Sequence, residues 1–138
     1  MSTILQIAST DRNLSIMMKA VKASGIEETL NGVGPFTLLA PVNLAFGKLP
    51  YPDTFENLVK VAGNQNRLTD ILSYHVLKGK KLLKDFRDGQ KLPTANGKEV
   101  TITVKDGEVR INGSKILARD MQGSNGVIHS VDSVNLPL

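Results

Sequence analysis

The sequence predicts an α+β fold in which several short helices come first and an antiparallel β-meander follows. In the first half, apolar residues recur at intervals of three and four, as along one face of a helix. In the second half, Val100, Ile102 and Val104 alternate with polar residues, as along a half-buried strand. The 138 residues are 41% apolar and include no cysteine. A chain of this size forms one stable core without disulfides, so we expect a single domain over residues 1–138.

The helices are predicted from their start and stop signals. Thr3 and Gln6 form a capping box ahead of the first helix. Apolar residues from Leu14 to Val21 define one face of a second helix, which Gly25 ends. A helical turn is expected over residues 26–30. The remaining helical segments are one capped by Asn43, one after a capping box at residues 53–56 and one over residues 68–72.

The strands are predicted from turn residues as well as from alternation. Residues 36–40 form a short apolar run between two prolines, which is typical of a buried strand. Asp106-Gly107 is a two-residue hairpin turn. In the register that it sets, both faces of the hairpin agree, because the facing pairs are Val104–Val109, Ile102–Ile111 and Lys105–Glu108. A second turn at residues 112–113 brings Ile116 beside Val109, and a last strand is expected over residues 127–136.

Composition argues against two classes of partner. The net charge is +4, but the basic residues are spread along the chain and only 4% of residues are aromatic. A nucleic-acid surface needs a sharper basic cluster with stacking aromatics, so we expect no nucleic-acid binding. No apolar run approaches the about 18 residues of a membrane span. The first residues lack the features of a leader peptide, so we expect a cytoplasmic protein unless a leader was removed.

Three segments together resemble the fasciclin family. The first opens with Gly-Pro-Phe-Thr at residues 34–37 and continues to the Ala-Pro-x-Asn-x-Ala-Phe pattern at residues 40–46. The second is a Tyr-His motif within residues 72–77, and the third is the closing segment at residues 125–132. Two positions depart from the family pattern: Val42 stands where Thr is common, and Leu44 where an acidic residue is common. The departures put in doubt any polar contact that the family makes there and suggest that Leu44 is exposed.

The resemblance implies a fasciclin-type wedge of antiparallel β-strands packed with the short helices. It also implies a binding or adhesion module without a cofactor and without general enzymatic activity. Our candidate partner-binding residues fall in three groups, which are Leu44 and Phe46 in the first segment, Tyr74 and His75 in the second, and the basic run Lys80, Lys81 and Lys84. A core role is the competing interpretation for Phe46 and for Tyr74.

The residues that could carry chemistry are few. His75 and His129 are the only histidines and have no metal-binding spacing, so we predict no metal site and no catalytic residue. Each is expected to be a structural histidine bonded to the backbone, with a pH-sensitive contact as the alternative. Ser124 lacks the glycine spacing of a nucleophile elbow. An enzyme would need a nucleophile and an orienting acid within reach of one of the histidines.

Two functions remain. The first is a protein-binding accessory subunit of a larger membrane-associated complex, cytoplasmic and attached to the membrane only through its partner subunits. The second is a secreted or periplasmic cell-adhesion domain. In isolation we expect a monomer in either case.

Overall fold

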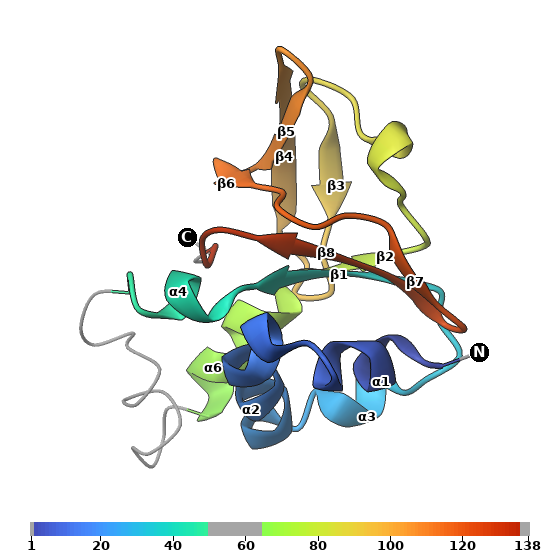
Figure 1. Ribbon diagram of the computed structural model, residues 1–138, viewed down its shortest axis with the longest axis vertical. Helices are drawn as coiled ribbons and strands as arrows, with labels where there is room; N and C mark the ends of the chain where they lie inside the picture. The colour runs from blue at the N-terminus through green and yellow to red at the C-terminus, as the bar shows by residue number, and fades with distance from the viewer. Residues whose placement is uncertain (1, 50–64, 136–138) are drawn as a thin grey trace.

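Two four-stranded sheets and a layer of short helices build the molecule, and the first sheet separates the helices from the second sheet (Figure 1). The computed structural model describes residues 2–49 and 65–135. The predicted helix that follows the capping box at residues 53–56 lies outside these residues. The α+β class is confirmed.

The helical layer follows the predicted start and stop signals. Its α-helices are α1 (Ile4–Ser9), α2 (Ser15–Ser24), α3 (Glu27–Leu30), α4 (Asn43–Phe46) and α6 (Gln65–Ser73), with a 3₁₀ turn η1 (Arg12–Leu14) ahead of α2. The capping box of Thr3 and Gln6 is present at α1. Helix α2 ends at Gly25, whose φ of 81° is left-handed and suits a residue without a Cβ.

The predicted capping role of Asn43 is wrong in one respect. Its side chain does not cap its own helix α4. Instead, Asn43 Oδ1 accepts a hydrogen bond of 2.9 Å from the Ile16 amide in the first turn of α2. Its Nδ2 donates to the Arg12 carbonyl at 3.0 Å and to the Ser15 hydroxyl at 2.9 Å. Asn43 therefore caps a helix that lies 28 residues earlier in the chain, as measured to Ser15.

The first sheet has the strand order β2-β1-β8-β7. Its strands are β1 (Phe36–Pro41), β2 (Val76–Lys78), β7 (Met121–Gly123) and β8 (Gly126–Val131). Strands β1 and β8 pair in parallel, from Phe36 beside Gly126 to Pro41 beside Val131, while the other pairs are antiparallel. No signal in the sequence predicts this parallel pair. The last strand is also shorter than its predicted range of 127–136, because β8 ends at Val131 and the chain bends after it.

The second sheet has the order β3-β4-β5-β6, and its hairpin follows the predicted register. Its strands are β3 (Lys91–Pro93), β4 (Glu99–Lys105), β5 (Glu108–Ile111) and β6 (Ser114–Lys115). All three predicted pairs of β4 and β5 are present, and the Ile116 amide donates to the Val109 carbonyl as expected. Single bridges, Leu77 to Thr94 and Ile116 to Val131, connect this sheet to the first.

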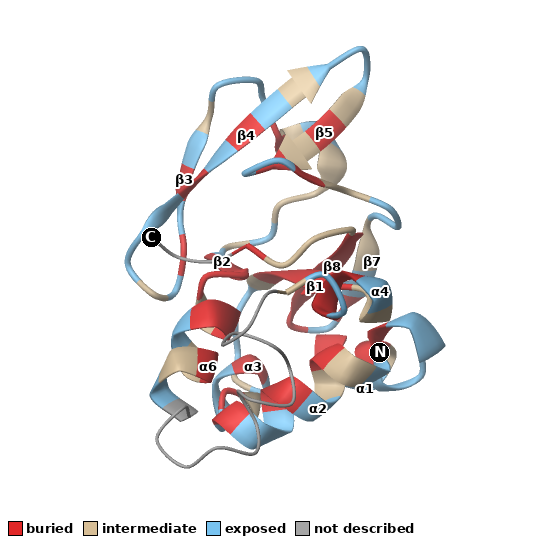
Figure 2. Cartoon of the chain, turned by 90° about the vertical axis from the view of Figure 1, so that its left-hand side faces the viewer, coloured by how far each residue is buried: buried red, intermediate tan, exposed pale blue. Residues whose placement is uncertain are grey.

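Two apolar cores result from this arrangement. The larger one lies between the helices and the first sheet, and the smaller one lies between the two sheets. Strand β8 is buried along its whole length, and β1 is buried except at Phe36, whereas the β4–β5 hairpin is buried only on alternate residues (Figure 2). The centre of the first sheet is thus shielded on both faces.

Candidate interaction surface

The three segments that resemble the fasciclin family are neighbours in the first sheet. Strand β1 comes from the first segment, β2 follows the Tyr-His pair of the second, and β8 belongs to the third. Because β1 lies between β2 and β8, the segments meet side by side although about 90 residues of chain separate β1 from β8. Their shared role is to build the first sheet.

His75 lies in the turn between α6 and β2 and is completely buried. The Asn135 amide donates to its Nε2 at 2.9 Å, so the ring proton lies on Nδ1, which donates to the Ile71 carbonyl at 2.7 Å. Burial lowers the pKa of His75 from 6.5 to about 4, and the bond to Ile71 opposes this only in part. The neutral ring therefore ties helix α6 to the C-terminal segment.

His129 lies on β8 and is also buried. The Asp120 amide donates to its Nδ1 at 3.1 Å, and its Nε2 donates to the Lys81 carbonyl at 2.7 Å. Burial lowers the pKa of His129, while the Lys81 bond and the Asp120 carboxylate, 3.9 Å from Nδ1, act in the opposite direction. This histidine holds the basic run of residues 80–84 against the first sheet. The predicted structural role is confirmed for both histidines.

Burial removes three of the candidate partner-binding residues from the surface. Phe46 and Tyr74 are 4% and 6% exposed, and His75 is not exposed at all. The Tyr74 hydroxyl donates to the Glu99 carbonyl at 3.0 Å and accepts from Asn112 Nδ2 at 2.7 Å. The structure thus places Phe46, Tyr74 and His75 in the interior, where Phe46 and Tyr74 pack in the two apolar cores, and their contact with a partner stays a prediction.

The other candidates remain accessible. Leu44 is 81% exposed on α4, although Ala45 and Phe46 beside it are buried. Lys80 and Lys84 are exposed and Lys81 is half-buried, around the 3₁₀ turn η2 (Leu83–Asp85). The structure separates them, since Leu44 lies on α4, just after the end of β1, whereas the lysines follow β2, whose last residue pairs with the start of β1.

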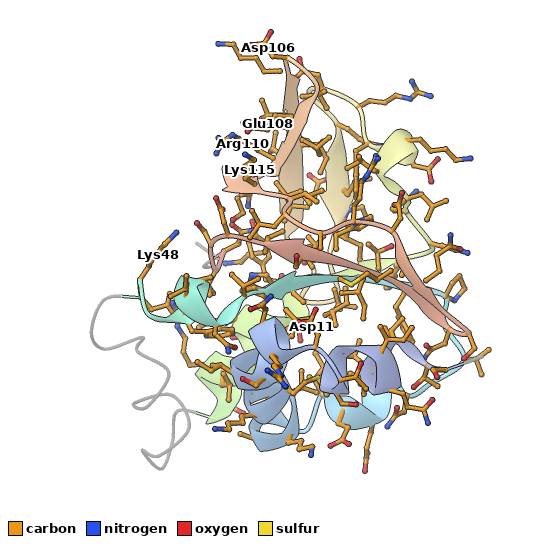
Figure 3. The ribbon with its side chains drawn as sticks, viewed as in Figure 1. Asp11, Lys48, Asp106, Glu108, Arg110 and Lys115 are labelled. Carbon is orange, nitrogen blue, oxygen red and sulfur yellow. The ribbon has the colours of Figure 1, made fainter. Side chains whose placement is uncertain are left out.

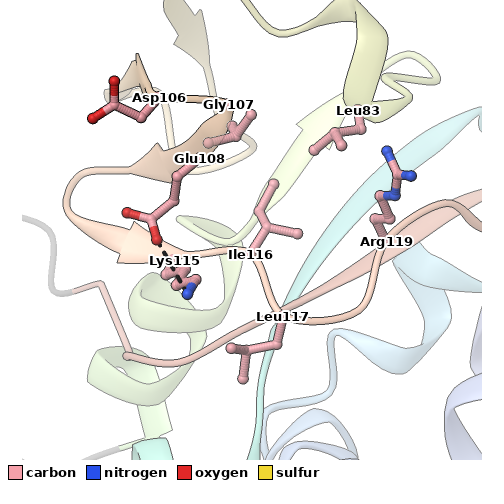
Figure 4. A pocket seen from close by; sticks show the side chains of 9 residues that line it. Leu83, Asp106, Gly107, Glu108, Lys115, Ile116, Leu117 and Arg119 are labelled. Atoms are coloured by element: carbon pink, nitrogen blue, oxygen red, sulfur yellow. Dashed lines mark ion pairs between the residues drawn. The ribbon is translucent and has the colours of Figure 1, made fainter.

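A groove that the sequence analysis missed lies between the β4–β5 hairpin and residues 115–119 (Figure 4). Its volume is about 330 Å³. Leu83, Val109, Ile116 and Leu117 provide its apolar surface, and Asp106, Glu108, Lys115 and Arg119 its charged residues. The sequence placed Asp106, Gly107, Glu108, Val109 and Ile116 in the predicted hairpin and its neighbour, but nothing in it indicated that they line a groove with Leu83 and Arg119.

Glu108 lies close to Arg110 and Lys115 and forms an ion pair with each (Figure 3). Its Oε2 is 2.7 Å from Arg110 Nε and its Oε1 is 3.1 Å from Lys115 Nζ. The hydrogen bonds from Lys115 and Arg110 lower the pKa of Glu108. Within the described residues, no group of acidic and histidine side chains could hold a metal ion.

The comparison with known protein families decides the assignment. The family model of the Fasciclin domain matches residues 12–137. The chain belongs to the fasciclin family. Protein sll1483 of Synechocystis is 40% identical over 98% of this chain and 73% of its own length. Protein sll1735 of the same organism is 34% identical over 99% of this chain and 98% of its own length.

A solved structure shares the fasciclin fold. The FAS1 domain pair of the insect cell adhesion molecule Fasciclin I is similar to this chain with a TM-score of 0.83 and 25% identity. The similarity covers 99% of this chain and 51% of that structure. Fasciclin domains are protein-interaction and adhesion modules and are generally non-catalytic. In the part of the fasciclin chain that the structure describes, no helix has the length and apolar character to cross a bilayer.

Proposed function

We propose that this fasciclin domain is an accessory subunit of a larger membrane-associated complex, which it joins by binding a protein partner on the cytoplasmic side. The exposed Leu44 carries the proposal. It is a large apolar side chain in a position where the family pattern commonly has a charge, and 81% of it is exposed. Covering this side chain with a partner would remove apolar surface from water, which stabilises a complex.

A cyanobacterial assembly is the first to test. The carbon-dioxide-uptake NADH-dehydrogenase-like complex of cyanobacteria contains a small fasciclin-domain subunit that is similar to this chain in size and domain content. The two Synechocystis relatives support a setting of this kind, since one of them matches the chain over 98% of its own length. Membership of that complex is part of the proposal.

The experiment is purification of the tagged protein from its own cells after separation of cytosol, membrane and medium. We expect stoichiometric recovery with membrane-complex subunits on the cytoplasmic side. Leu44→Ala should lower recovery, because loss of a central contact weakens binding by at least about 2 kcal/mol. Val33→Ala is the matched control, since Val33 is 94% exposed and lies on another surface.

The lysines are tested in the same purification. A variant with Lys80, Lys81 and Lys84 all changed to Ala should bind the partner more slowly, and its binding rate should depend less on the salt concentration. The reason is that charges at the rim of an interface act mainly on the association rate. If this variant and Leu44→Ala both recover the partner as the unmodified protein does, the assignment of these surfaces is wrong.

The alternative function is a secreted or periplasmic adhesion domain. The likeness to the FAS1 domain pair of an insect cell adhesion molecule favours it. Recovery of the protein from the periplasm or the medium, without subunits of a membrane complex, would support this alternative over the accessory subunit.

A further inference from the structure

Side chains of the first sheet and its border hold the backbone of the basic run in place. On β1, Thr37 Oγ1 accepts a hydrogen bond of 2.8 Å from the Lys81 amide. On β8, His129 Nε2 donates to the Lys81 carbonyl at 2.7 Å. Directly before β7, Asp120 Oδ1 accepts from the Leu83 amide at 2.8 Å. The position of the run therefore depends on these backbone contacts.

Two of these anchors depend on each other. The Asp120 amide donates to His129 Nδ1 at 3.1 Å, while the carboxylate of the same residue holds Leu83. Asp120 has a φ of 54°, in the left-handed region that residues with a Cβ seldom adopt. Both bonds start from this one constrained residue. If the amide turns away from the ring, the carboxylate therefore moves away from Leu83 as well.

The surroundings of the His129 ring are apolar except on the side of Asp120 and Lys81. The Phe86 ring lies 5.5 Å away between centroids, and the neighbour of His129 on β1 is Leu39. Among the described residues, the Asp120 carboxylate is the only one close enough to pair with the ring. Lys81 contacts the ring through its carbonyl, and its side chain is half-buried. Burial lowers the pKa of His129 and only these two polar neighbours oppose it, so the ring is neutral at neutral pH.

A second proton on the ring opens this arrangement at a defined atom. It occupies Nδ1 of His129, where the Asp120 amide donates, and so places two donors face to face. The Asp120 carboxylate then becomes the favoured partner of Nδ1, because an opposite charge stabilises the imidazolium. Its Oδ1 lies 3.9 Å from Nδ1, and closing this gap to about 2.8 Å draws it away from the Leu83 amide. Asp85 offers no substitute anchor, since its carboxylate accepts from the Leu82 amide inside the run.

We propose that His129 and Asp120 form a proton-sensitive latch, which holds the basic run against the first sheet while the ring is neutral and releases it when the ring takes up a proton. The lysines themselves do not hold the run. Within residues 2–49 and 65–135, the side chains of Lys80, Lys81 and Lys84 form no hydrogen bond and no ion pair. The latch therefore controls whether these charges stand on one fixed surface. It is a property of the domain itself and does not depend on the proposed function.

The test is an NMR titration of the isotope-labelled full chain from about pH 8 to about pH 4.5. The ring nitrogens of His129 and the amide of Leu83 are followed together, and we expect one midpoint for both. The midpoint should lie below 6.5, because burial lowers the pKa of His129 from that ordinary value. Across it, the protection of the Leu83 amide from hydrogen exchange should fall at least about tenfold. The buried Ile102 amide, which donates to the Gln90 carbonyl in the second sheet, should keep its protection.

Three variants separate the latch from a general loosening in acid. Asp120→Asn keeps an oxygen for the Leu83 amide and tolerates a positive φ, but it lacks the charge that favours the protonated ring. The shared midpoint should therefore move to lower pH. His129→Gln takes up no proton, so its Leu83 amide should not respond in this range. His75→Gln is the matched control, because it removes the other buried histidine and should leave the Leu83 midpoint unchanged.

Three outcomes would overturn the latch. They are a Leu83 amide that does not follow the titration of His129, an unchanged midpoint in Asp120→Asn, and a loss of protection at Leu83 and Ile102 together. If His129→Gln does not fold, the shared midpoint and the Asp120→Asn shift still decide. The proposed function fails separately, if the unmodified protein recovers no partner from any cell fraction, and that result leaves the titration unaffected.

Discussion

Each histidine of this protein joins two segments that are distant in the sequence. His75 connects helix α6 to Asn135, and His129 connects strand β8 to the backbone of Lys81. Both rings are neutral in these bonds, because each accepts a hydrogen bond from a backbone amide at one nitrogen. Protonation of that nitrogen would replace an acceptor by a donor that faces another donor. These two side chains therefore make the stability of the fold depend on pH.

The stability should fall as the pH drops from 6.5 towards 4. The pKa of His75 is about 4 in the folded protein and 6.5 as the ordinary value, so the fold favours the neutral ring. The contribution of His75 is complete above pH 6.5 and is lost as the pH falls towards 4, by about 3 kcal/mol in all. Urea unfolding across this range, compared between the unmodified protein and His75→Gln, measures it. His129 is present in both proteins, so parallel curves would contradict the assignment to His75.

For single residues, the sequence predicted the structural roles of the motif but not the direction in which its side chains point. The motif containing Tyr74 and His75 was recognised, and the structural roles expected for both residues are present. Both side chains are buried, which the motif did not indicate, because a motif marks a residue as special without showing whether it packs inward or outward. The groove at Ile116 and Leu117 was missed for a related reason. It forms from segments that meet only in the folded chain.

At the scale of elements, Asn43 links helix α4, which it begins, to helix α2, whose first turn it caps. The local sequence around either helix does not indicate this link. Asn43→Ala removes the bond to the Ile16 amide and leaves the first turn of α2 without this cap. We expect a loss of about 1–2 kcal/mol in the free energy of unfolding, the usual effect of losing a helix cap. Asn13→Ala is the control, because Asn13 is exposed in η1 and its side chain caps no helix. Equal unfolding of the two variants in urea would show that the cap contributes nothing.

The elements that were predicted correctly are those whose signals are local. The hairpin of β4 and β5 was found with its register, because the Asp106-Gly107 turn and both faces of the pair agree. Strands β2, β3 and β7 have three residues each, too few for an alternation to be seen. The end of β8 was misplaced because apolar residues continue beyond Val131, where Val134 packs against the larger core outside any strand.

At the scale of the whole molecule, the parallel pair β1–β8 unites the two halves of the chain. Gly126 makes this pairing close, because a Cβ at that position would overlap the carbonyl group of Phe36. Gly126→Ala should therefore separate the strands and lower the free energy of unfolding by at least about 2 kcal/mol. Gly47→Ala is the control, since a Cβ there meets only the Leu44 carbonyl at 3.4 Å and the backbone φ of −68° suits alanine. Similar urea midpoints for both variants would contradict the close approach.

The same parallel pair sets the order of events during synthesis on the ribosome. Strand β1 emerges early, but its neighbour β8 is translated about 90 residues later. Until then β1 can pair only with β2, and the apolar edge that β8 covers stays open to chaperones and to other nascent chains. We therefore expect this domain to complete its fold only when residues 126–131 have left the exit tunnel, so a stalled or truncated chain that lacks them is a substrate for proteolysis rather than a partly working protein.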